Sequence, residues 1–376
     1  MKIVITGGHF SPAYSLIQEL KDKHTIIVIG RRYAFEGDTN ETFEYKVCKK
    51  FGIPFEVLNA GRLQRKFTRH TIPAAARFPG GIIRALKILR REKPSVVVTF
   101  GGYVGLPVAL AARVLSIPVV LHEQTLNAGL SARLISKFAA VILTSFPSSK
   151  DSFPGKNVVL TGNPIRPELL SEGKKIKYEK PLIYITGGST GSHAINQAIV
   201  QIIPNLLSEF LVFHQTGDSR EFGDYEKIKN VKSGLSGPLQ KRYFVEKFFP
   251  PSEVAGLIAS AAFVISRAGI NTVTELIALR TPAILIPLPH GQHNEQLQNA
   301  KFFQDLGLGR LLEQDDMTPQ LLLSTIHAMI KEKSEFEKKF IDAQKYIYLD
   351  AAEKIAEQVL YYGERGRTKK TANTPS

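Results

Sequence analysis

Short runs of apolar and β-branched residues alternate with segments long enough to form helices along most of the chain. In the first part these runs occupy residues 2–6, 25–29, 95–100, 118–121 and 141–143. Comparable runs follow at residues 182–186, 211–214, 243–245, 263–265 and 283–286. Strands that alternate with helices are typical of a parallel sheet with helices on both faces. The pattern therefore predicts an α/β protein with doubly wound sheets.

The pattern restarts after a polar stretch at residues 166–180, which predicts two similar domains. Ile5-Thr6-Gly7-Gly8 opens the first, and Ile185-Thr186-Gly187-Gly188 recurs at the matching strand of the second. We expect domains at residues 1–162 and 163–340, and a helix at 341–362 that packs back on the first domain. Residues 363–376 have no apolar period, which predicts a disordered basic tail. Since open sheets bind ligands at the carboxyl ends of their strands, the glycine turns should face a central cleft.

Composition narrows the class of protein. The chain has 376 residues, of which 43% are hydrophobic, including 22 Phe and 12 Tyr, so it is not disordered over most of its length. Cys48 is the single cysteine, which excludes an intrachain disulfide or a cysteine-rich zinc site. No run approaches the roughly 18 apolar residues of a membrane span. The N-terminus is interpreted as a first strand rather than a secretory signal, so we expect a cytosolic protein.

The net charge of +15 is concentrated in the first half of the chain. Residues 1–162 contain 23 Lys and Arg against 10 Asp and Glu, whereas residues 163–376 contain 26 against 24. The densest stretch has a single acid, Glu92, and ten cations: Arg62, Arg65, Lys66, Arg69, Arg77, Arg84, Lys87, Arg90, Arg91 and Lys93. Apolar residues among these cations favour an anionic membrane surface over nucleic acid. A solvated basic helix face remains the alternative.

The best phosphate-binding turn is Gly187-Gly188-Ser189-Thr190-Gly191-Ser192, which follows a strand and precedes an apolar helix. Backbone N–H groups at a helix N-terminus attract phosphate, and glycine allows the ligand to approach closely. The turn lacks the Lys-Ser/Thr ending of a P-loop and the acidic partner of a dinucleotide fingerprint. A tight turn can also need glycine for geometry alone.

Two further segments carry polar residues after predicted strands. Thr272 and Glu275 lie near the start of a helix, where a carboxylate can accept both hydroxyls of a ribose or simply complement the helix dipole. Glu295, Gln296 and Asn299 begin another helix and can bind the hydroxyls of a sugar. The spacing of His290 and His293, with no third ligand nearby, favours solvated loop histidines over a metal site.

In this order, the segments resemble the GT-B glycosyltransferases of the MurG type, which add N-acetylglucosamine to a lipid-linked muramyl peptide. The resemblance covers roughly residues 1 to 360. It depends on six motifs in register: Gly101-Gly102-Tyr103, His122-Glu123-Gln124, Gly162-Asn163-Pro164-Ile165-Arg166, the Gly187 to Gly191 turn, His214-Gln215-Thr216-Gly217 and the Glu275 segment. It implies two Rossmann-like domains that face a central cleft.

The resemblance also implies roles for individual residues. UDP-N-acetylglucosamine would bind the second domain through Arg166, Gly188, Ser189, Gly191, Phe249, Ile270, Thr272, Glu275, Glu295 and Gln296. The undecaprenyl-diphosphate-linked acceptor would bind the first domain through Gly7, Gly8, His9, Gly101, Gly102, Tyr103, Thr125 and Asn127. The cationic stretch would dock on the cytoplasmic face of the cell membrane, which makes the protein peripheral. No nucleic-acid partner is expected.

The departures from the family pattern fall on the acceptor side. The family's first loop usually has a double Gly-Gly repeat, whereas this chain has only Thr6-Gly7-Gly8-His9. Thr125 stands where the family generally has Asn or Asp, with Asn127 two residues later, and the segment from Arg31 to Asn40 also differs from the usual pattern. Fewer amides are therefore expected to hold the acceptor diphosphate.

The expected reaction is an inverting displacement at the anomeric carbon. His9 is the candidate base, because imidazole titrates near pH 6.5, although it can equally serve only to bind acceptor phosphate. Tyr103, His122 and Glu123 are further candidate catalytic residues, the last two either as a second acid–base pair or as part of the acceptor pocket. The chain has no Asp-x-Asp cluster, so no metal or other cofactor is expected to be essential.

Three alternatives remain open from the sequence. A related GT-B enzyme that glycosylates diacylglycerol would share the donor motifs and the membrane surface. Non-hydrolysing UDP-N-acetylglucosamine epimerases share the two-domain fold. The third is a binding protein, either a nucleotide-sugar sensor without catalysis or a basic nucleic-acid-binding protein, although no recognisable single-strand module accompanies the cations.

Overall fold

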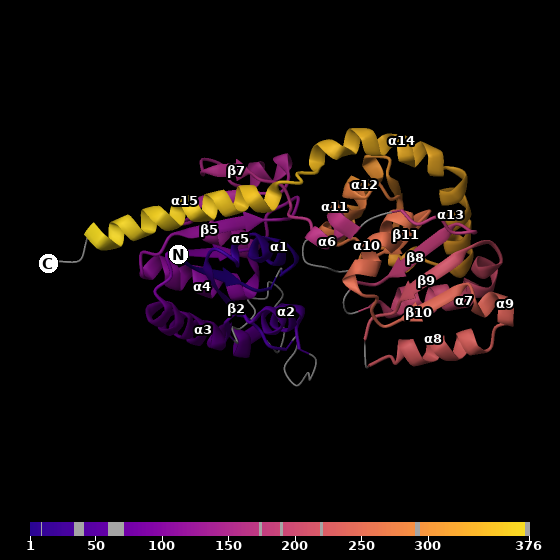
Figure 1. Ribbon diagram of the computed structural model, residues 1–376, viewed down its shortest axis with the longest axis horizontal. Coiled ribbons are helices and arrows are strands. Elements are labelled where there is room, and N and C mark those ends of the chain that lie inside the picture. The colour runs from indigo at the N-terminus through magenta and orange to yellow at the C-terminus, as the bar shows by residue number, and fades with distance from the viewer. Residues whose placement is uncertain are drawn as a thin grey trace. The chain divides into compact units, whose positions relative to one another are not determined.

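The computed structural model describes residues 1–8, 10–33, 41–58, 71–172, 175–188, 191–218, 221–289 and 294–372. The chain divides into two compact units (Figure 1). The N-terminal unit comprises Met1–Arg166 and Tyr348–Ser376, and the C-terminal unit comprises Pro167–Ile347. The first boundary lies four residues beyond the predicted one, because Ile165 is still held in the N-terminal unit, where its carbonyl accepts a hydrogen bond from Ser15 Oγ.

The N-terminal unit contains a seven-stranded parallel sheet in the order β3-β2-β1-β4-β5-β6-β7. Its strands are β1 (Lys2–Thr6), β2 (Thr25–Gly30), β3 (Phe55–Val57), β4 (Val96–Thr99), β5 (Val119–Glu123), β6 (Val141–Thr144) and β7 (Val158–Leu160). Its helices are α1 (Phe10–Leu20), α2 (Phe43–Phe51), α3 (Thr71–Glu92), α4 (Gly102–Val114), α5 (Leu130–Ile135), the 3₁₀ turn η1 (Pro147–Ser152) and α15 (Ala351–Ala372). This strand order is that of a doubly wound nucleotide-binding fold.

Each face of this sheet has its own hydrophobic core. Along β1, Ile3 and Ile5 enter the core that also contains α1 and α15, whereas Val4 enters the core beneath α3 and α4. The central strands are apolar at nearly every position because both of their faces are covered.

Helix α15 extends further than its sequence pattern predicts. Ile355 and Val359 are buried with residues of α1 and of the sheet. The lack of an apolar period after residue 363 predicts a disordered tail, but the helix continues to Ala372. This last part of the helix packs closely on the sheet through glycine: a Cβ on Gly366 would lie 2.7 Å from the Ser95 carbonyl oxygen, so a larger residue would not fit. Residues 341–347, which were expected in this C-terminal helix, belong to the C-terminal unit.

The C-terminal unit contains a six-stranded parallel sheet in the order β10-β9-β8-β11-β12-β13. Its strands are β8 (Leu182–Thr186), β9 (Leu211–Gln215), β10 (Tyr243–Glu246), β11 (Phe263–Ser266), β12 (Ala283–Leu285) and β13 (Gly309–Leu311). Its helices are α6 (Pro167–Glu172), α7 (His193–Glu209), α8 (Asp224–Ser233), α9 (Gly237–Gln240), α10 (Pro251–Ser260), α11 (Ile270–Ala278), α12 (Glu295–Asp305), α13 (Pro319–Lys331) and α14 (Lys333–Ala343), with 3₁₀ turns η3 (Gln314–Asp316) and η4 (Gln344–Tyr346).

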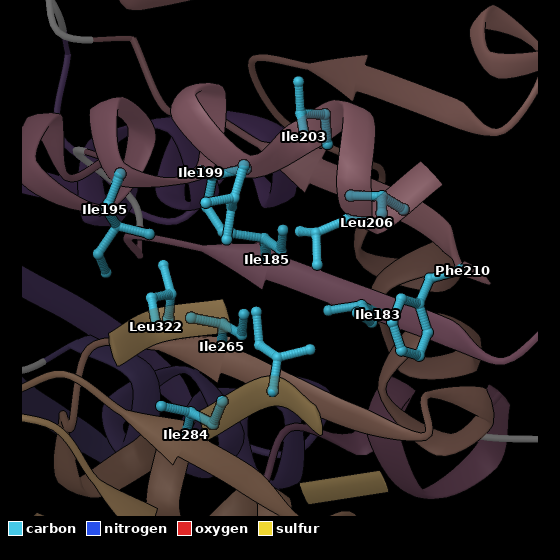
Figure 2. Close-up of a cluster of buried hydrophobic side chains, with 14 of the residues drawn as sticks. Ile183, Ile185, Ile195, Ile199, Ile203, Leu206, Phe210, Ile265, Ile284 and Leu322 are labelled. Atoms are coloured by element: carbon cyan, nitrogen blue, oxygen red, sulfur yellow. The ribbon is translucent and has the colours of Figure 1, made fainter. Parts of the chain in front are cut away.

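The core of the C-terminal unit lies between α7 and its sheet (Figure 2). Ile195 and Ile199 on α7 are fully buried with Ile185 of β8 and Ile265 of β11. Apolar residues at intervals of three and four direct one face of α7 onto the sheet, which fixes where the helix begins relative to the end of β8.

Every strand predicted from the sequence is present, and β3, β7 and β13 are additional. Each additional strand has three residues, and each lies at an edge of its sheet. These three strands are only partly buried, unlike the equally short β12, so they give no distinct apolar run and are defined by their hydrogen bonds to a neighbour. Within the described ranges, none of the helices combines the length and the apolar character needed to cross a bilayer.

Candidate functional site

The glycine turn after β8 has a backbone that requires glycine. Gly188 and Gly191 have φ values of +82° and +77°, a region that other residues rarely adopt. A Cβ on Gly191 would lie 2.1 Å from the carbonyl oxygen of Thr216, whereas Gly188 has open space around it. Ser189 lies outside the described residues. The turn therefore passes directly against the end of β9.

Helix α7 begins at the end of this turn with an anion-binding terminus. Ser192 is the N-cap, and its Oγ accepts a hydrogen bond from Ile195 N at 3.4 Å. The first N–H groups of a helix have no acceptor within the helix, and the dipole makes this end positive. The first turn contains no acidic residue. These amides can hold a diphosphate, as the sequence predicts.

A buried network of polar side chains joins the first turn of α7 to the end of β9. His214 is fully buried, and this burial lowers its pKa to about 3, so its ring is neutral. Its Nε2 lies 2.9 Å from Asn196 Oδ1, and its Nδ1 lies 2.8 Å from Tyr243 Oη. Because Asn196 Nδ2 donates to Thr216 O, its oxygen faces the ring, so His214 donates from Nε2. The His214-Gln215-Thr216-Gly217 motif thus has a structural role in this unit.

Other donor-side candidates lie at the carboxyl ends of neighbouring strands. Ile270, Thr272 and Glu275 are on α11, which follows β11, and Glu275 is buried. Glu295 and Gln296 begin α12. The structure thus gathers most of the predicted donor residues in the turn that follows β8 and on the helices that follow β11 and β12. Arg166 is the last residue of the N-terminal unit, and His290 and His293 lie outside the described residues.

Four predicted donor-side groups already have partners within the chain. Two are in the glycine turn, where Gly188 N donates to Thr186 Oγ1 at 3.1 Å and Gly191 N donates to Gly188 O at 3.2 Å. The N–H of Phe249 donates to Gln215 Oε1 at 3.2 Å. The Oε1 of Gln296 accepts a hydrogen bond from Leu288 N at 2.9 Å. A nucleotide would have to replace the contact with Gln215 to use the Phe249 amide, and only the NH₂ group of Gln296 can donate to a sugar.

Arg267 is a donor-side residue that the sequence did not single out for a role. Burial lowers its pKa to about 10. Its guanidinium donates to the carbonyl oxygens of Ile286 and Pro287, at 3.2 and 3.1 Å, and to Gln314. It therefore holds the backbone that leads from β12 towards α12. Its place directly after β11 is the signal that could have identified it.

On the acceptor side, the first glycine turn is occupied by an internal carboxylate. Gly7 N donates to Ile29 O at 2.8 Å, and Gly8 N donates to Glu44 Oε2 at 2.9 Å. Glu44 Oε1 also accepts from Arg31 N at 2.8 Å. Burial raises the pKa of Glu44, and these N–H bonds oppose that rise. In this conformation, the amides of Gly7 and Gly8 are not available to the acceptor diphosphate, in contrast to the prediction; His9 lies outside the described residues.

The second glycine turn is better suited to an anion. Gly101 and Gly102 both have positive φ values, and α4 begins at Gly102 without a side-chain cap. Arg31, at the end of β2, places its guanidinium carbon 4.2 Å from the centre of the Tyr103 ring. The sequence marked the segment from Arg31 as unusual but gave Arg31 no role, because only the fold brings the end of β2 beside α4.

His122 and Glu123 are enclosed in the protein rather than exposed as an acid–base pair. His122 is fully buried, which lowers its pKa to about 4, and its Nε2 lies 3.1 Å from Gly162 O. Burial raises the pKa of Glu123. Its Oε1 accepts from Thr125 N and Oγ1 at 2.9 and 2.6 Å, and its Oε2 accepts from Gly129 N. These groups hold the turn that contains Thr125 and Asn127, so the structure favours the pocket-shaping alternative.

The described part of the chain contains no group of three or more His, Cys, Asp or Glu side chains arranged to hold a metal ion.

Two protein-family models match this chain, one in its N-terminal part and one in its C-terminal part. The model of the glycosyltransferase family 28 N-terminal domain matches residues 4–144, and that of the C-terminal domain matches residues 182–359. A relative from Clostridium kluyveri is 33% identical over 90% of this chain and 94% of its own length. A relative from Listeria monocytogenes is 32% identical over 96% of this chain and 99% of its own. Both are named UDP-N-acetylglucosamine–N-acetylmuramyl-(pentapeptide) pyrophosphoryl-undecaprenol N-acetylglucosamine transferase.

Solved structures share the fold. The crystal structure of Acinetobacter baumannii MurG has a TM-score of 0.70 and 24% identity, and the match covers 96% of this chain and 99% of that one. The UDP-GlcNAc 2-epimerase from Neisseria meningitidis, bound to UDP-GlcNAc, has a TM-score of 0.65 and 17% identity, over 96% of this chain and 100% of that one. The prediction of a GT-B fold with two Rossmann-like domains is confirmed. The fold alone does not separate transferases from epimerases.

Proposed function

The chain belongs to glycosyltransferase family 28, and from this membership we propose the reaction that it catalyses. It is a glycosyltransferase that transfers N-acetylglucosamine from UDP-N-acetylglucosamine to lipid-linked N-acetylmuramyl-pentapeptide, a step of peptidoglycan synthesis. The observation that carries this conclusion is an identity of 31–33% to transferases of that name along nearly the whole of both chains.

The donor nucleotide is proposed to bind the C-terminal unit. The diphosphate lies along the turn from Gly188 to Ser192 and accepts hydrogen bonds from the first amides of α7, because the amides of Gly188 and Gly191 already donate within the chain. The positive φ values, which let a ligand approach the turn closely, and the helix dipole support this assignment. Glu275 accepts the ribose hydroxyls, and Glu295 and Gln296 contact the sugar.

The acceptor diphosphate is proposed to bind the start of α4 instead of the first glycine turn. Two observations support this assignment. Glu44 occupies Gly8 N, and Arg31 brings a cation to Tyr103 on the first turn of α4. A guanidinium and a helix N-terminus together replace the amides that the shorter first loop lacks.

The proposed chemistry is a single displacement with inversion. The C4 hydroxyl of the muramyl sugar attacks the anomeric carbon and loses its proton to a base, for which His9 is the candidate, as the bond to the diphosphate breaks. Oriented amides at α7 stabilise the charge that develops on the leaving UDP. We therefore expect turnover to persist in excess EDTA, and its loss would show that a divalent metal is essential.

The membrane surface is proposed to contact one face of α3. Arg84, Lys87 and Arg90 are exposed on this helix, and the side chain of Ile83 is 55% exposed among them. Each cation near an anionic bilayer contributes about 1 kcal/mol, and an apolar side chain can enter the headgroup region. The protein would then act at the cytoplasmic face as a peripheral enzyme. Co-sedimentation should occur with vesicles of anionic lipid and disappear at high salt or with neutral lipid.

One assay tests the proposed reaction against its alternatives. Purified protein receives UDP-N-acetylglucosamine with a radiolabelled sugar and either lipid-linked muramyl pentapeptide or diacylglycerol. We expect label only in the muramyl lipid. Label in diacylglycerol would favour the glycolipid synthase, and conversion of the nucleotide sugar without an acceptor would favour the epimerase. UDP binding without any product would favour the sensor.

A further inference from the structure

A histidine and a carboxylate form a pair at the start of α7. His193 is the first residue of this helix, and its Nδ1 lies 2.8 Å from Asp224 Oδ1. The side chain of Asp224 is only 4% exposed, whereas that of His193 is 37% exposed. The imidazole also stacks on Phe222, with ring centroids 4.1 Å apart and planes 14° apart. The ring is thus fixed in both position and plane, with one edge open to solvent.

Asp224 is itself fixed by the polar network beneath α7. It is the first residue of α8, and its Oδ2 accepts a hydrogen bond from Asn196 Nδ2 at 2.8 Å. Asn196 in turn bonds to His214. A carboxylate only accepts hydrogen bonds, so His193 must present an N–H at Nδ1. The other ring nitrogen, Nε2, has no hydrogen-bond partner among the residues that the structure describes.

We propose that His193 binds the diphosphate of the donor nucleotide through Nε2 and that Asp224 is its positioning residue. The inference rests on the proposed function, because it takes the turn before α7 as the diphosphate site. Side chains on a helix lean towards its N-terminus, so the ring at the first position lies on the side of that turn. Asp224 and a diphosphate are both hydrogen-bond acceptors, so a ring placed between them binds both by donating from each nitrogen.

The role of this pair in the reaction concerns charge, not proton transfer. As the acceptor oxygen forms its bond to the anomeric carbon, the electron pair of the breaking bond moves onto the β-phosphate oxygen. The acceptor proton goes to the separate base. His193 retains its protons and donates a hydrogen bond to the leaving diphosphate, where it adds a cationic donor to the neutral amides of α7.

The competing explanation is that the pair only joins α7 to α8. The chain offers a matched control for this, because a second histidine–carboxylate pair lies at the opposite end of the same helix. His327 Nε2 on α13 is 3.4 Å from Oε1 of Glu209, the last residue of α7, and both side chains are at least half exposed. Removing His327 deletes a histidine–carboxylate pair of the same helix that is longer and more exposed and lies far from the diphosphate turn.

Calorimetric titration of the full chain with UDP and with uridine tests the proposal. We expect His193→Ala to weaken UDP binding by about 10- to 100-fold, the range for a hydrogen bond to a charged group, and to leave uridine binding unchanged. His193→Gln should also weaken it, whereas His193→Arg, which keeps the charge, should restore most of the affinity. His327→Ala should bind both ligands as the wild type does.

Three results would overturn the inference. In the first, His193→Ala and His193→Gln bind UDP within two-fold of the wild type. In the second, these variants lose affinity for uridine as much as for UDP, and in the third His327→Ala loses as much UDP affinity as His193→Ala. A wild-type chain that binds no UDP would instead refute the proposed function, so the two failures are distinguishable.

Discussion

The two glycines of the donor turn provide a test of how closely that turn packs against β9. Gly188 and Gly191 have nearly the same positive φ, so alanine at either position costs about 1–2 kcal/mol in backbone strain. Only Gly191→Ala adds a collision, because its Cβ would lie 2.1 Å from Thr216 O. Relief of such overlap typically costs about 1–3 kcal/mol more. We therefore expect Gly191→Ala to be the less stable variant by about that amount.

Differential scanning calorimetry of both variants measures this difference. The transition of the C-terminal unit can be recognised because UDP should raise its Tm. For a unit of this size, about 1 kcal/mol corresponds to roughly 2–4 °C, so Gly191→Ala should melt roughly 2–12 °C below Gly188→Ala. Its UDP affinity should also fall further, since the turn must move away from Thr216. Equal Tm values for the two variants would refute the close contact between Gly191 and β9.

Three further predictions follow from the structure. Arg31→Ala should raise KM for the lipid acceptor and leave KM for UDP-N-acetylglucosamine unchanged, whereas Arg32→Ala, which removes an exposed pair with Glu41, should change neither in steady-state assays. Burial lowers the pKa of His122 to about 4 and that of His214 to about 3, so the unfolded chain binds the extra protons below about pH 6.5. The free energy of unfolding from urea titrations should therefore fall towards pH 4, by up to about 1.4 kcal/mol per histidine and pH unit. The fall should be smaller in His214→Gln, which lacks one of the two histidines. Glu44 and Glu123, whose pKa values are raised, act in the opposite direction. Gly366→Val should destabilise the N-terminal unit by about 1–3 kcal/mol in the same titrations because its side chain would meet Ser95 and Pro118, whereas Thr368→Val on the exposed side of α15 should be nearly neutral.

The acceptor side shows why motifs alone do not decide which groups are free to bind a ligand. Gly7-Gly8 and Gly101-Gly102 look equivalent in the sequence, since each pair follows an apolar strand. In the fold, Glu44 on α2 accepts a hydrogen bond from Gly8 N. In the second pair, Gly101 N donates to Thr99 Oγ1. The difference comes from a residue more than thirty positions away from Gly8, which no local pattern contains.

Local patterns were sufficient for the framework of the protein. Apolar runs separated by helix-length segments predicted ten strands, of which all but β10 are central in their sheets. Strands buried on both faces must be apolar throughout, which makes them visible in the sequence. Glycines at strand ends marked the turns, because a positive φ is a property of one residue and its neighbours. The family motifs likewise predicted donor-side residues such as Gly191 and Glu275, and the fold places these two in the turn after β8 and on the helix after β11.

Tertiary structure decided the properties that depend on partners distant in the chain. The edge strands β3, β7 and β13 form because a neighbouring strand supplies their hydrogen bonds. Helix α15 continues past Gly363 because its glycines allow it to pack closely against the sheet. Burial turned His122 from a candidate acid–base group into a neutral structural one. The pairing of His193 with Asp224 depends on α8 folding beside α7. Sequence specifies local backbone preference, whereas burial, charge state and access to ligand are set by what the rest of the chain places nearby.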